Sequence, residues 1–369
     1  MIERPKRKKV CIAIHSLAHA GAERVAASWA NYLVTQGHDV SVIVYANSDD
    51  TYVLNDDVNI VPISSAKEEY FSMSAIKKLF CIRKVVKKER PQILISFLPK
   101  MQITMMLATF GMRIKRIETV RNNPWIDKDV GKKRFLWNLC FHKGDRIIVQ
   151  TNEQSLYFSE NVRKKCIVIS NPISKEFYDI QKVYNDDKIK KFVAVARLNT
   201  QKNYPMMIQA FSQVVHTHPE ITLDIYGNGT SEAQQEMEKL ICSLGMENNI
   251  HLCGWRKDIA SLLPQYDAFL MSSNYEGMPN ALAEAMATGL VCLSTDCRTG
   301  PKDMIDHGKC GFLAKTGDAD SFAKEIKEIV NLDIRQCENI GLNAREKILE
   351  MCSDKNTLAR LKHLIEDEL

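Results

Sequence analysis

The 369-residue sequence has no apolar run long enough to cross a membrane. Its longest nearly uninterrupted apolar stretch, residues 103–112, is about half of the roughly 20 residues that a membrane-spanning helix needs. The apolar stretch Val10 to Ile14, which follows a basic N-terminus, is shorter than a signal-peptide core. These absences predict a chain without a membrane span or a secretory signal.

Paired cysteines are also absent. The eleven cysteines are odd in number and scattered, none forms a Cys-x-x-Cys pair, and the closest two are Cys292 and Cys297. This pattern argues against a disulfide framework or a cysteine-based zinc site. It predicts reduced thiols in a cytoplasmic protein.

Acidic residues are outnumbered by basic ones in the first half of the chain. The net charge of +5 combines +12 over residues 1–190 with the remaining −7 over residues 191–369. The apolar and charged fractions, 45% and 26%, are those of a soluble globular protein, which excludes disorder and fibrous repeats. The charge asymmetry therefore indicates two halves that meet different partners.

Short β-rich runs alternate with helical stretches along the whole chain. In the first half the predicted strands are 10–15, 40–45, 93–97, 117–120 and 147–150, and in the second half 192–196, 222–226, 250–253, 268–271 and 291–295. Such alternation predicts parallel sheets with helices on both faces, and one sheet of more than ten strands would be unusual. We therefore predict two Rossmann-like, doubly wound α/β domains facing across a cleft. Their predicted bounds are 1–182 and 190–352, with a last helix near 353–369 packing back on the first domain.

The most distinctive loop follows the predicted strand 268–271. Glu276 precedes Gly277, Met278, Pro279 and Asn280, and the N–H groups of a helix start favour an anion such as a phosphate. Glu284, eight residues after Glu276, lies among alanines, which suggests a packed helix and a buried carboxylate with partners. A helix-start acid and a solvated helix face remain the simpler explanation of the two glutamates.

Two further loops carry candidate ligand-binding residues. Arg197 and Lys202 flank a loop that opens a helix, where two cations suit a diphosphate, although a solvated basic loop has the same composition. Gly227 lies in a Gly-x-Gly turn that lacks the third glycine of the dinucleotide fingerprint, so a tight turn explains it equally well. Near the N-terminus, Gly21 is placed for backbone approach to a ligand, and His15 ends the first strand.

Taken in order, these loops resemble those of the retaining GT-B glycosyltransferases of family 4. The resemblance rests on Ala20-Gly21-Ala22-Glu23-Arg24, on Arg197 with Lys202, on the E-x7-E pair Glu276 and Glu284, and on Gly300-Pro301 and Gly311-Phe312. It spans nearly the whole chain and is most specific from residue 192 to residue 314. Within the family, it points to enzymes that build bacterial surface polysaccharides and lipid-linked glycans.

The resemblance implies a role for each motif. Glu276, Arg197 and Lys202 would be the catalytic residues, with the two cations on the diphosphate and Glu276 on hydroxyls of the donor sugar. Glu284 would bind the ribose, and the backbone of Gly277 to Asn280 would assist Glu276. The other donor-binding residues would be Gly21, Gly227, and Cys253 and Arg256 near the base. The nucleotide sugar, expected to be UDP-linked, is a substrate, and neither a cofactor nor a metal is expected.

The sequence departs from the family pattern at two places. Ala20 stands where members often have a first glycine, and Arg121 stands where some carry a histidine. We place Arg121, with His15, on the acceptor side and name no general base. A nucleotide-sugar epimerase of the same fold and a non-catalytic sugar-nucleotide-binding subunit remain alternatives.

The basic charge of the first half gathers on two helical segments. Residues 76–90 carry seven cations and one acid, and residues 132–146 combine cations with Phe135, Trp137 and Phe141. An anionic lipid surface attracts such segments, although a core-facing helix with a solvated outer face has the same pattern. We expect peripheral docking on the inner face of the cytoplasmic membrane, a lipid-linked or glycan acceptor, and no nucleic acid, because no recognition motif accompanies the charge.

Overall fold

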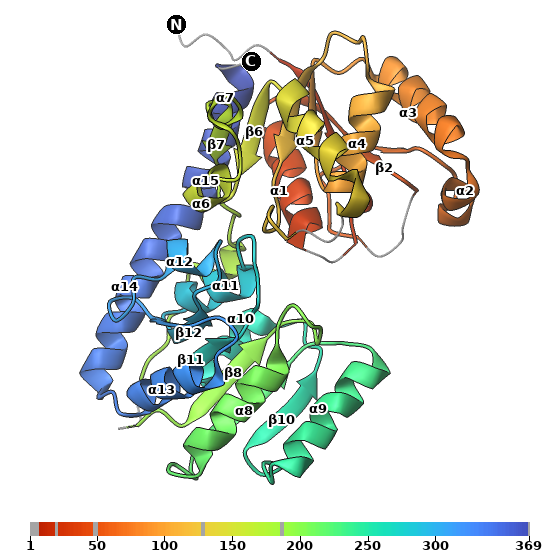
Figure 1. Cartoon of the computed structure of the whole chain (residues 1–369). Coiled ribbons are helices and arrows are strands. Elements are labelled where there is room, and N and C mark those ends of the chain that lie inside the picture. Colours follow the sequence, from red (N-terminus) through yellow and green to blue (C-terminus); the bar gives the residue numbers. More distant parts are fainter. Residues whose placement is uncertain (1–6, 19–20, 47–50, 127–129, 185–187, 368–369) are drawn as a thin grey trace, which may run out of the picture. The chain divides into compact units, whose positions relative to one another are not determined.

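The computed structural model describes residues 7–18, 21–46, 51–126, 130–184 and 188–367. The chain divides into two compact units, each of which we describe separately (Figure 1). Unit 1 contains residues 1–172 and 354–369, and unit 2 contains residues 173–353. Both are α/β units built on a parallel sheet, as the alternating pattern predicts.

The sheet of unit 1 has seven parallel strands in the order β3-β2-β1-β4-β5-β6-β7. They are β1 (Lys9–Ala13), β2 (Asp39–Val44), β3 (Asn59–Pro62), β4 (Ile93–Ser96), β5 (Lys115–Thr119), β6 (Arg146–Val149) and β7 (Cys166–Val168). The five predicted strands are confirmed, and the two edge strands β3 and β7 are additional.

Helices cover both faces of this sheet. On one face, α1 (Gly21–Thr35) and α15 (Asp354–Glu366) share a core with the alternate side chains of β1, β2 and β4. On the other face lie α3 (Ala75–Glu89), α4 (Pro99–Ala108) and α5 (Arg134–Lys143). The shorter helices of unit 1 are α2 (Lys67–Ser72), η1 (Gly131–Lys133), α6 (Asn152–Ser155) and α7 (Glu160–Arg163).

The sheet of unit 2 has six parallel strands in the order β10-β9-β8-β11-β12-β13. They are β8 (Lys191–Val195), β9 (Thr222–Tyr226), β10 (Ile250–Gly254), β11 (Ala268–Met271), β12 (Val291–Thr295) and β13 (Phe312–Ala314). Each predicted strand of this half is confirmed to within one residue at either end, and β13 is additional.

The helices of unit 2 also form two layers. One face packs on α8 (Tyr204–Val215), α9 (Ser231–Ser243) and α13 (Ala319–Val330), and the other on α11 (Asn280–Ala287) and α14 (Ile334–Cys352). The shorter helices are η2 (Lys175–Phe177), α10 (Ile259–Leu262), η3 (Leu263–Gln265) and α12 (Pro301–Met304). No helix among the described residues is long and apolar enough to cross a membrane.

The division between the units falls earlier than the predicted bound at residue 182. Residues 173–182 belong to unit 2 because Ile173 and Phe177 are buried in its core and Lys182 forms an ion pair with Asp267. The chain returns to unit 1 at residue 354, where Leu361 and the other leucine and isoleucine side chains of α15 are buried.

Both sheets place their first and fourth strands side by side at the centre. β1 pairs with β2 and β4, and β8 pairs with β9 and β11, so the chain reverses its direction of winding there. In open parallel sheets, ligands bind beyond the carboxyl ends of strands at this reversal. The loops after β8 and β11 are therefore where the topology of unit 2 favours a site.

Candidate functional site

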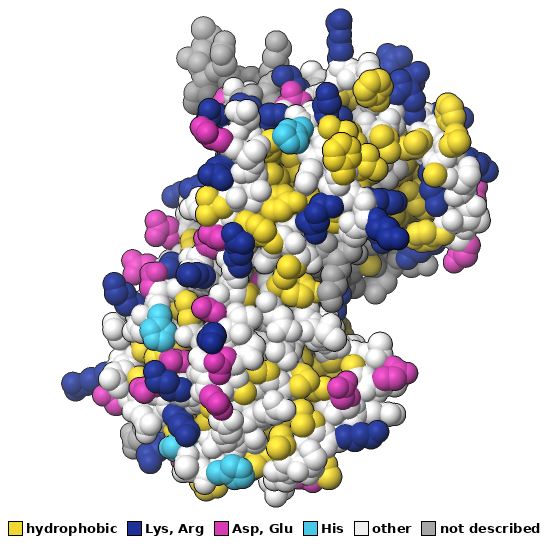
Figure 2. Space-filling view, in the orientation of Figure 1, with side chains coloured by type: hydrophobic (Ala, Val, Ile, Leu, Met, Phe, Trp, Pro, Cys, Tyr) yellow, Lys and Arg dark blue, Asp and Glu magenta, His cyan; other side chains and the backbone are white. Residues whose placement is uncertain are grey.

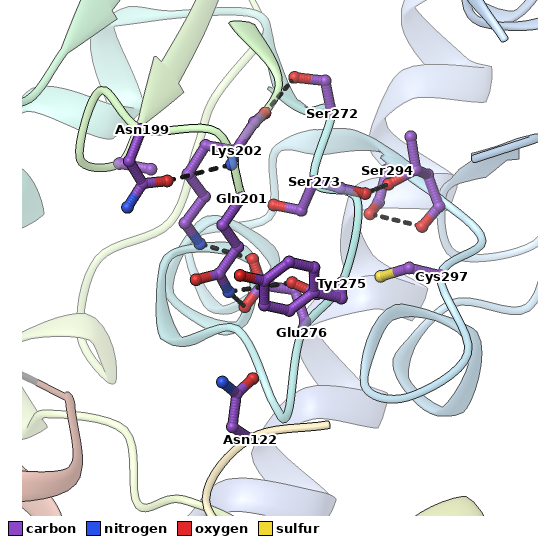
Figure 3. Close-up of polar contacts among 12 residues, drawn as sticks. Asn122, Asn199, Gln201, Lys202, Ser272, Ser273, Tyr275, Glu276, Ser294 and Cys297 are labelled. Atoms are coloured by element: carbon purple, nitrogen blue, oxygen red, sulfur yellow. Dashed lines mark hydrogen bonds and ion pairs between the residues drawn. The ribbon is translucent and has the colours of Figure 1, made fainter. Parts of the chain in front are cut away.

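An ion pair joins the loops after β8 and β11 (Figure 3). Nζ of Lys202 donates to Oε1 of Glu276 over 2.5 Å, and the two side chains are only 16% and 7% exposed. Nε2 of Gln201 donates to the carbonyl of Tyr275 at 2.9 Å and lies 3.4 Å from Oε2 of Glu276. The structure thus brings together two residues that lie 74 positions apart in the sequence.

The loop that carries Lys202 is held by hydrogen bonds from the loop after β11. Oγ of Ser272 donates to the carbonyls of Lys202 and Asn203, at 2.7 and 3.1 Å. Asn274 donates through its side chain to the carbonyl of Thr200 at 2.9 Å. Asn203 adopts φ of 47°, which few residues other than glycine and asparagine accept readily, and α8 starts directly after it.

Glu276 is held from its other side by the segment after β12. The hydroxyl of Thr299 donates to the carbonyl of Glu276, and Gly300 follows with φ of 87°. A Cβ at Gly300 would lie 2.8 Å from the carbonyl oxygen of Gly277, so only glycine fits. Sequence reasoning missed Gln201 and Thr299, although the Gly300-Pro301 pair marks the same turn.

Cys297 lies close to this ion pair but is chemically inert there. Its side chain is buried, and burial raises the pKa of its thiol to about 12, with Glu276 contributing in the same direction. The thiol therefore stays neutral near pH 7 and is no candidate nucleophile.

Arg197 follows β8 and is exposed. Its guanidinium forms no hydrogen bond or ion pair with any residue in the described ranges. The backbone before it is fixed by a close approach, since a Cβ at Gly227 would lie 1.8 Å from the carbonyl oxygen of Ala196. Gly227 therefore lets the backbone of its turn lie against the residue before Arg197. This role is structural and agrees with the tight-turn explanation.

The predicted helix after Glu276 is confirmed as α11, with one shift. Pro279 is the residue before the helix and not part of its first turn, with φ of −75° and ψ of 112°. Gly277, Met278 and Pro279 are buried, and Glu284 lies on α11 with its side chain largely buried. Glu284 is therefore not on a solvated helix face.

Cys253 and Arg256 lie at the end of β10 and just beyond it, and both are exposed. Arg256 already has a partner, because its Nε and Nη2 donate to the two carboxylate oxygens of Asp258 at 2.7 and 3.1 Å. The neighbouring Trp255 is 64% exposed. A donor-binding role for this segment stays a prediction.

The remaining predicted residues lie in unit 1. Gly21 is the first residue of α1, and His15, two residues beyond the end of β1, stacks on Tyr45 with ring centroids 4.8 Å apart. Arg121 lies after β5 with its guanidinium carbon 4.5 and 4.8 Å from the ring centroids of Trp29 and Phe97. Burial lowers the pKa of Arg121 to about 9. The acceptor-side roles of His15 and Arg121 stay predictions.

Two aspartates separated by one residue, Asp318 and Asp320, each have a structural role. Asp318 caps α13 by accepting from the backbone N–H of Ser321 at 3.0 Å, and Asp320 accepts from Gln213 at 3.0 Å. Within the described ranges, no group of three or more His, Cys, Asp or Glu side chains is arranged to hold a metal ion.

The arrangement favours an anionic ligand that also presents hydroxyl groups. An unpaired arginine and a fixed lysine supply positive charge, while the carboxylate of Glu276 can accept hydrogen bonds. Fixed cations lower a barrier most where negative charge grows during the reaction.

Comparisons with known proteins agree with this chemistry. The sequence model "Glycosyltransferase Family 4" matches residues 19–177, and "Glycosyl transferases group 1" matches residues 176–347. An uncharacterized glycosyltransferase from Methanocaldococcus jannaschii is 27% identical over 293 residues, which is 69% of this chain and 70% of that protein. A Campylobacter jejuni enzyme is 24% identical over 94% of this chain and 98% of its own. Its name is GalNAc-α-(1→4)-GalNAc-α-(1→3)-diNAcBac-PP-undecaprenol α-1,4-N-acetyl-D-galactosaminyltransferase.

Among solved structures, Anabaena HepE in complex with UDP and glucose superposes with a TM-score of 0.80 at 17% identity, covering 98% of this chain and all of that one. At that identity the likeness shows the fold, which is GT-B. The two sequence models together span most of the chain and match in consecutive order. The chain therefore belongs to the GT-B glycosyltransferases of the group 1 and family 4 type.

Proposed function

We propose that this glycosyltransferase moves a sugar from a UDP-linked donor to a lipid-linked glycan or lipopolysaccharide-type acceptor, with retention at the anomeric carbon. The ion pair between Lys202 and Glu276, at the reversal point of the unit 2 sheet, carries the proposal. The names of the relatives support the substrate classes, since one transfers a sugar to an undecaprenol-linked glycan and a structural neighbour binds UDP and glucose.

In the proposed reaction, the bond from the anomeric carbon to the β-phosphate oxygen breaks, a bond from that carbon to the acceptor hydroxyl oxygen forms, and the hydroxyl proton is released. The departing UDP gains negative charge in the transition state. Lys202 is held in place before substrate arrives, and Arg197 is free to turn toward the diphosphate. Both cations therefore favour the transition state over the ground state.

The two glutamates would serve different parts of the donor. Oε2 of Glu276 lies 3.4 Å from Nε2 of Gln201, whereas Oε1 lies 2.5 Å from Nζ of Lys202. Because Oε2 is held less closely, it is available to a sugar hydroxyl. Glu284 lies eight residues further along the chain, on α11, and would accept from the ribose hydroxyls. We therefore expect Glu276 to act on the transfer step and Glu284 on donor affinity.

A product assay with matched variants tests this assignment. Purified enzyme is incubated with a set of UDP-sugars and a polyprenyl-diphosphate glycan, and products are identified by mass spectrometry. We expect the wild type to transfer sugar. Arg197→Ala should slow transfer about 100-fold, and Glu284→Ala should weaken UDP binding about tenfold. Both variants should remain folded. Free sugar and UDP as the only products would favour the epimerase alternative, and transfer unaffected by both variants would contradict the site.

We also propose that the enzyme works in the cytoplasm at the inner face of the membrane, with unit 1 serving the acceptor. The basic segments of unit 1 support this location. Fractionation of cells that produce the enzyme checks it, with release from membranes by about 1 M salt as the sign of peripheral attachment.

A further inference from the structure

Side chains from other segments hold three carbonyl groups of the loop after β11. Each carbonyl and the residue that donates to it form a pair, and the three pairs are Ser273 with Thr295, Tyr275 with Gln201, and Glu276 with Thr299. Both threonines are 0% exposed. On the face of unit 2 drawn in Figure 2, by contrast, acidic, basic and apolar side chains are interspersed. The contacts that distinguish this loop are therefore internal.

The carbonyls of Glu276 and Gly277 both lie against the turn that follows β12. The first accepts from the hydroxyl of Thr299, and the second lies 2.8 Å from the position that a Cβ on Gly300 would take. In a trans peptide the C=O and N–H groups point in opposite directions. The N–H of Gly277 shares a peptide plane with the Glu276 carbonyl, so it points away from this turn.

The N–H of Gly277 is not used within unit 2. Gly277 is buried, yet its N–H donates to no carbonyl or side chain in the described part of the chain. Buried backbone N–H groups in folded proteins almost always have a partner. This N–H adjoins Glu276, whose carboxylate is fixed by Lys202. It is therefore a hydrogen-bond donor that an oxygen atom of a bound ligand can use.

Glycine makes the peptide between residues 276 and 277 easy to reverse. Reversal changes φ of Gly277, and glycine adopts positive φ about as readily as negative φ. Gly277 does not have a positive φ in this structure. The reversed peptide would present its carbonyl where the N–H is now, and a carbonyl repels the oxygen atoms of a ligand. The Thr299 hydroxyl opposes this reversal, because a buried carbonyl without a hydrogen-bond donor is unfavourable.

We infer that Thr299 is a positioning residue for sugar transfer, whose hydroxyl selects the peptide orientation in which the Gly277 N–H donates to an oxygen of the transferred sugar. Thr299 is fully buried and acts only through this peptide. A hydrogen-bond donor that is fixed before the substrate arrives needs no reorganisation during the reaction. The inference deepens the proposed function and rests on it for the identity of the ligand, a nucleotide sugar.

Two substitutions separate the hydroxyl of Thr299 from the shape of its side chain. Thr299→Val keeps the shape and removes the hydroxyl, and we expect kcat to fall about 10- to 100-fold because one hydrogen-bond donor is misdirected. The Kd of UDP, which lacks the sugar, should stay within about twofold of the wild-type value, and Thr299→Ser should restore kcat to within about threefold. An unchanged kcat in Thr299→Val would overturn the inference.

Thr295→Val is the matched control. It removes an equally buried hydroxyl at the end of β12 and leaves the Ser273 carbonyl, in the same loop, without that donor. We expect it to lower the melting temperature as much as Thr299→Val does, but to transfer sugar at the wild-type rate. An equal loss of transfer in both variants would show that the rigidity of the whole loop matters and would overturn the role of this one peptide.

Crystal structures of the wild type and of Thr299→Val without ligand test the orientation directly. We expect the peptide between residues 276 and 277 to be reversed, or present in two orientations, in the variant alone. A single unchanged orientation would contradict the inference. If Thr299→Val does not fold, hydrogen exchange of the wild type decides, since the Gly277 N–H should gain protection from a UDP-sugar and not from UDP. Equal protection by both ligands would count against the inference.

Failure of the proposed function gives a different pattern of results. If the wild type binds and transfers no UDP-sugar, the proposed function fails, while a reversed peptide in Thr299→Val would still show that Thr299 sets the orientation. If the wild type transfers sugar and Thr299→Val transfers it equally well, only the inference about Thr299 fails.

Discussion

At the scale of single residues, the site depends on a charge pair that is complete within unit 2. Lys202 and Glu276 each come from a loop that sequence reasoning singled out, because polar residues after parallel strands gather at one edge. The contact of Thr299 with the Glu276 carbonyl could not be predicted, since nothing in a lone threonine specifies a partner 23 residues away. Motif residues were thus predictable, and the residues that hold them were not.

The first prediction concerns the charge of Glu276. Glu276→Gln keeps the shape of the side chain but removes the negative charge that fixes Lys202, and we expect the transfer rate to fall by about 100- to 1,000-fold. Initial rates measure the effect, and the exposed Glu236→Gln serves as control. Equal rates for the two variants would show that the ion pair has no part in transfer.

The second prediction uses Gly227. Gly227→Ala places a methyl group 1.8 Å from the Ala196 carbonyl oxygen, so the backbone must shift and unit 2 should lose about 2–4 kcal/mol of stability. Gly245→Ala also puts alanine at a positive φ, 66°, but meets no atom within 4 Å, and should cost about 1 kcal/mol. Thermal unfolding compares the two, and similar melting temperatures would contradict the close approach.

The third prediction concerns Glu118 of β5, which is buried. Burial raises the pKa of its carboxyl to about 8. The folded state therefore keeps a proton that the unfolded chain loses near pH 4.5, so this stability is complete at low pH and is lost as pH rises toward 8. The free energy of unfolding should fall by at most about 1.4 kcal/mol for each pH unit in this range.

Urea unfolding between pH 5 and pH 8.5 measures this slope. Glu118→Gln should reduce the pH dependence, while the exposed Glu160→Gln should leave it as in the wild type. If the stability of Glu118→Gln fell with pH as steeply as that of the wild type, the assignment to Glu118 would be wrong.

At the scale of elements, long and buried segments were predictable and short edges were not. Strands β4, β6 and β11 contain buried apolar runs, namely 93–95, 147–149 and 268–271, so their pattern is unambiguous. β3 is mostly exposed and ends in Pro62, and β7 has three half-buried residues, so neither carries a clear period. The predicted bound at residue 182 rests on the polar stretch 178–190, whereas the compact units divide at residue 173, because Ile173 and Phe177 are buried in the core of unit 2.

The fourth prediction concerns α15, which packs on unit 1. Leu361→Ala removes a fully buried side chain and should destabilise unit 1 by about 2–5 kcal/mol without affecting unit 2. Hydrogen exchange measures this, with faster exchange expected in β1 and unchanged exchange in β8. The exposed Lys355→Ala on the same helix should leave both units unchanged.

At the scale of the whole molecule, unit 2 is one continuous segment and unit 1 is not. The chain passes between the units twice, at residues 172–173 and at residues 353–354. These two crossings are adjacent, because the N–H of Ile173 donates to the carbonyl of Cys352 at 3.0 Å. The fifth prediction follows. Residues 173–353 should fold alone, whereas residues 1–172 should not, because they lack the apolar face of α15.

Circular dichroism and limited proteolysis of the separate pieces check this expectation. Joining residues 1–172 to residues 354–367 through a short Gly-Ser linker should restore cooperative unfolding, since the two crossings lie side by side. Cooperative unfolding of residues 1–172 by themselves would show that α15 is dispensable.

The place of α15 also has a consequence for the order of events on the ribosome. Domains generally fold as they emerge, the N-terminal one first. Here α15 is translated after all of unit 2, so one face of the unit 1 sheet is only partly covered, by α1, while unit 2 is completed. The part of the chain made first is thus the last to reach its native core, and during that interval its exposed apolar face is the one that a chaperone would recognise.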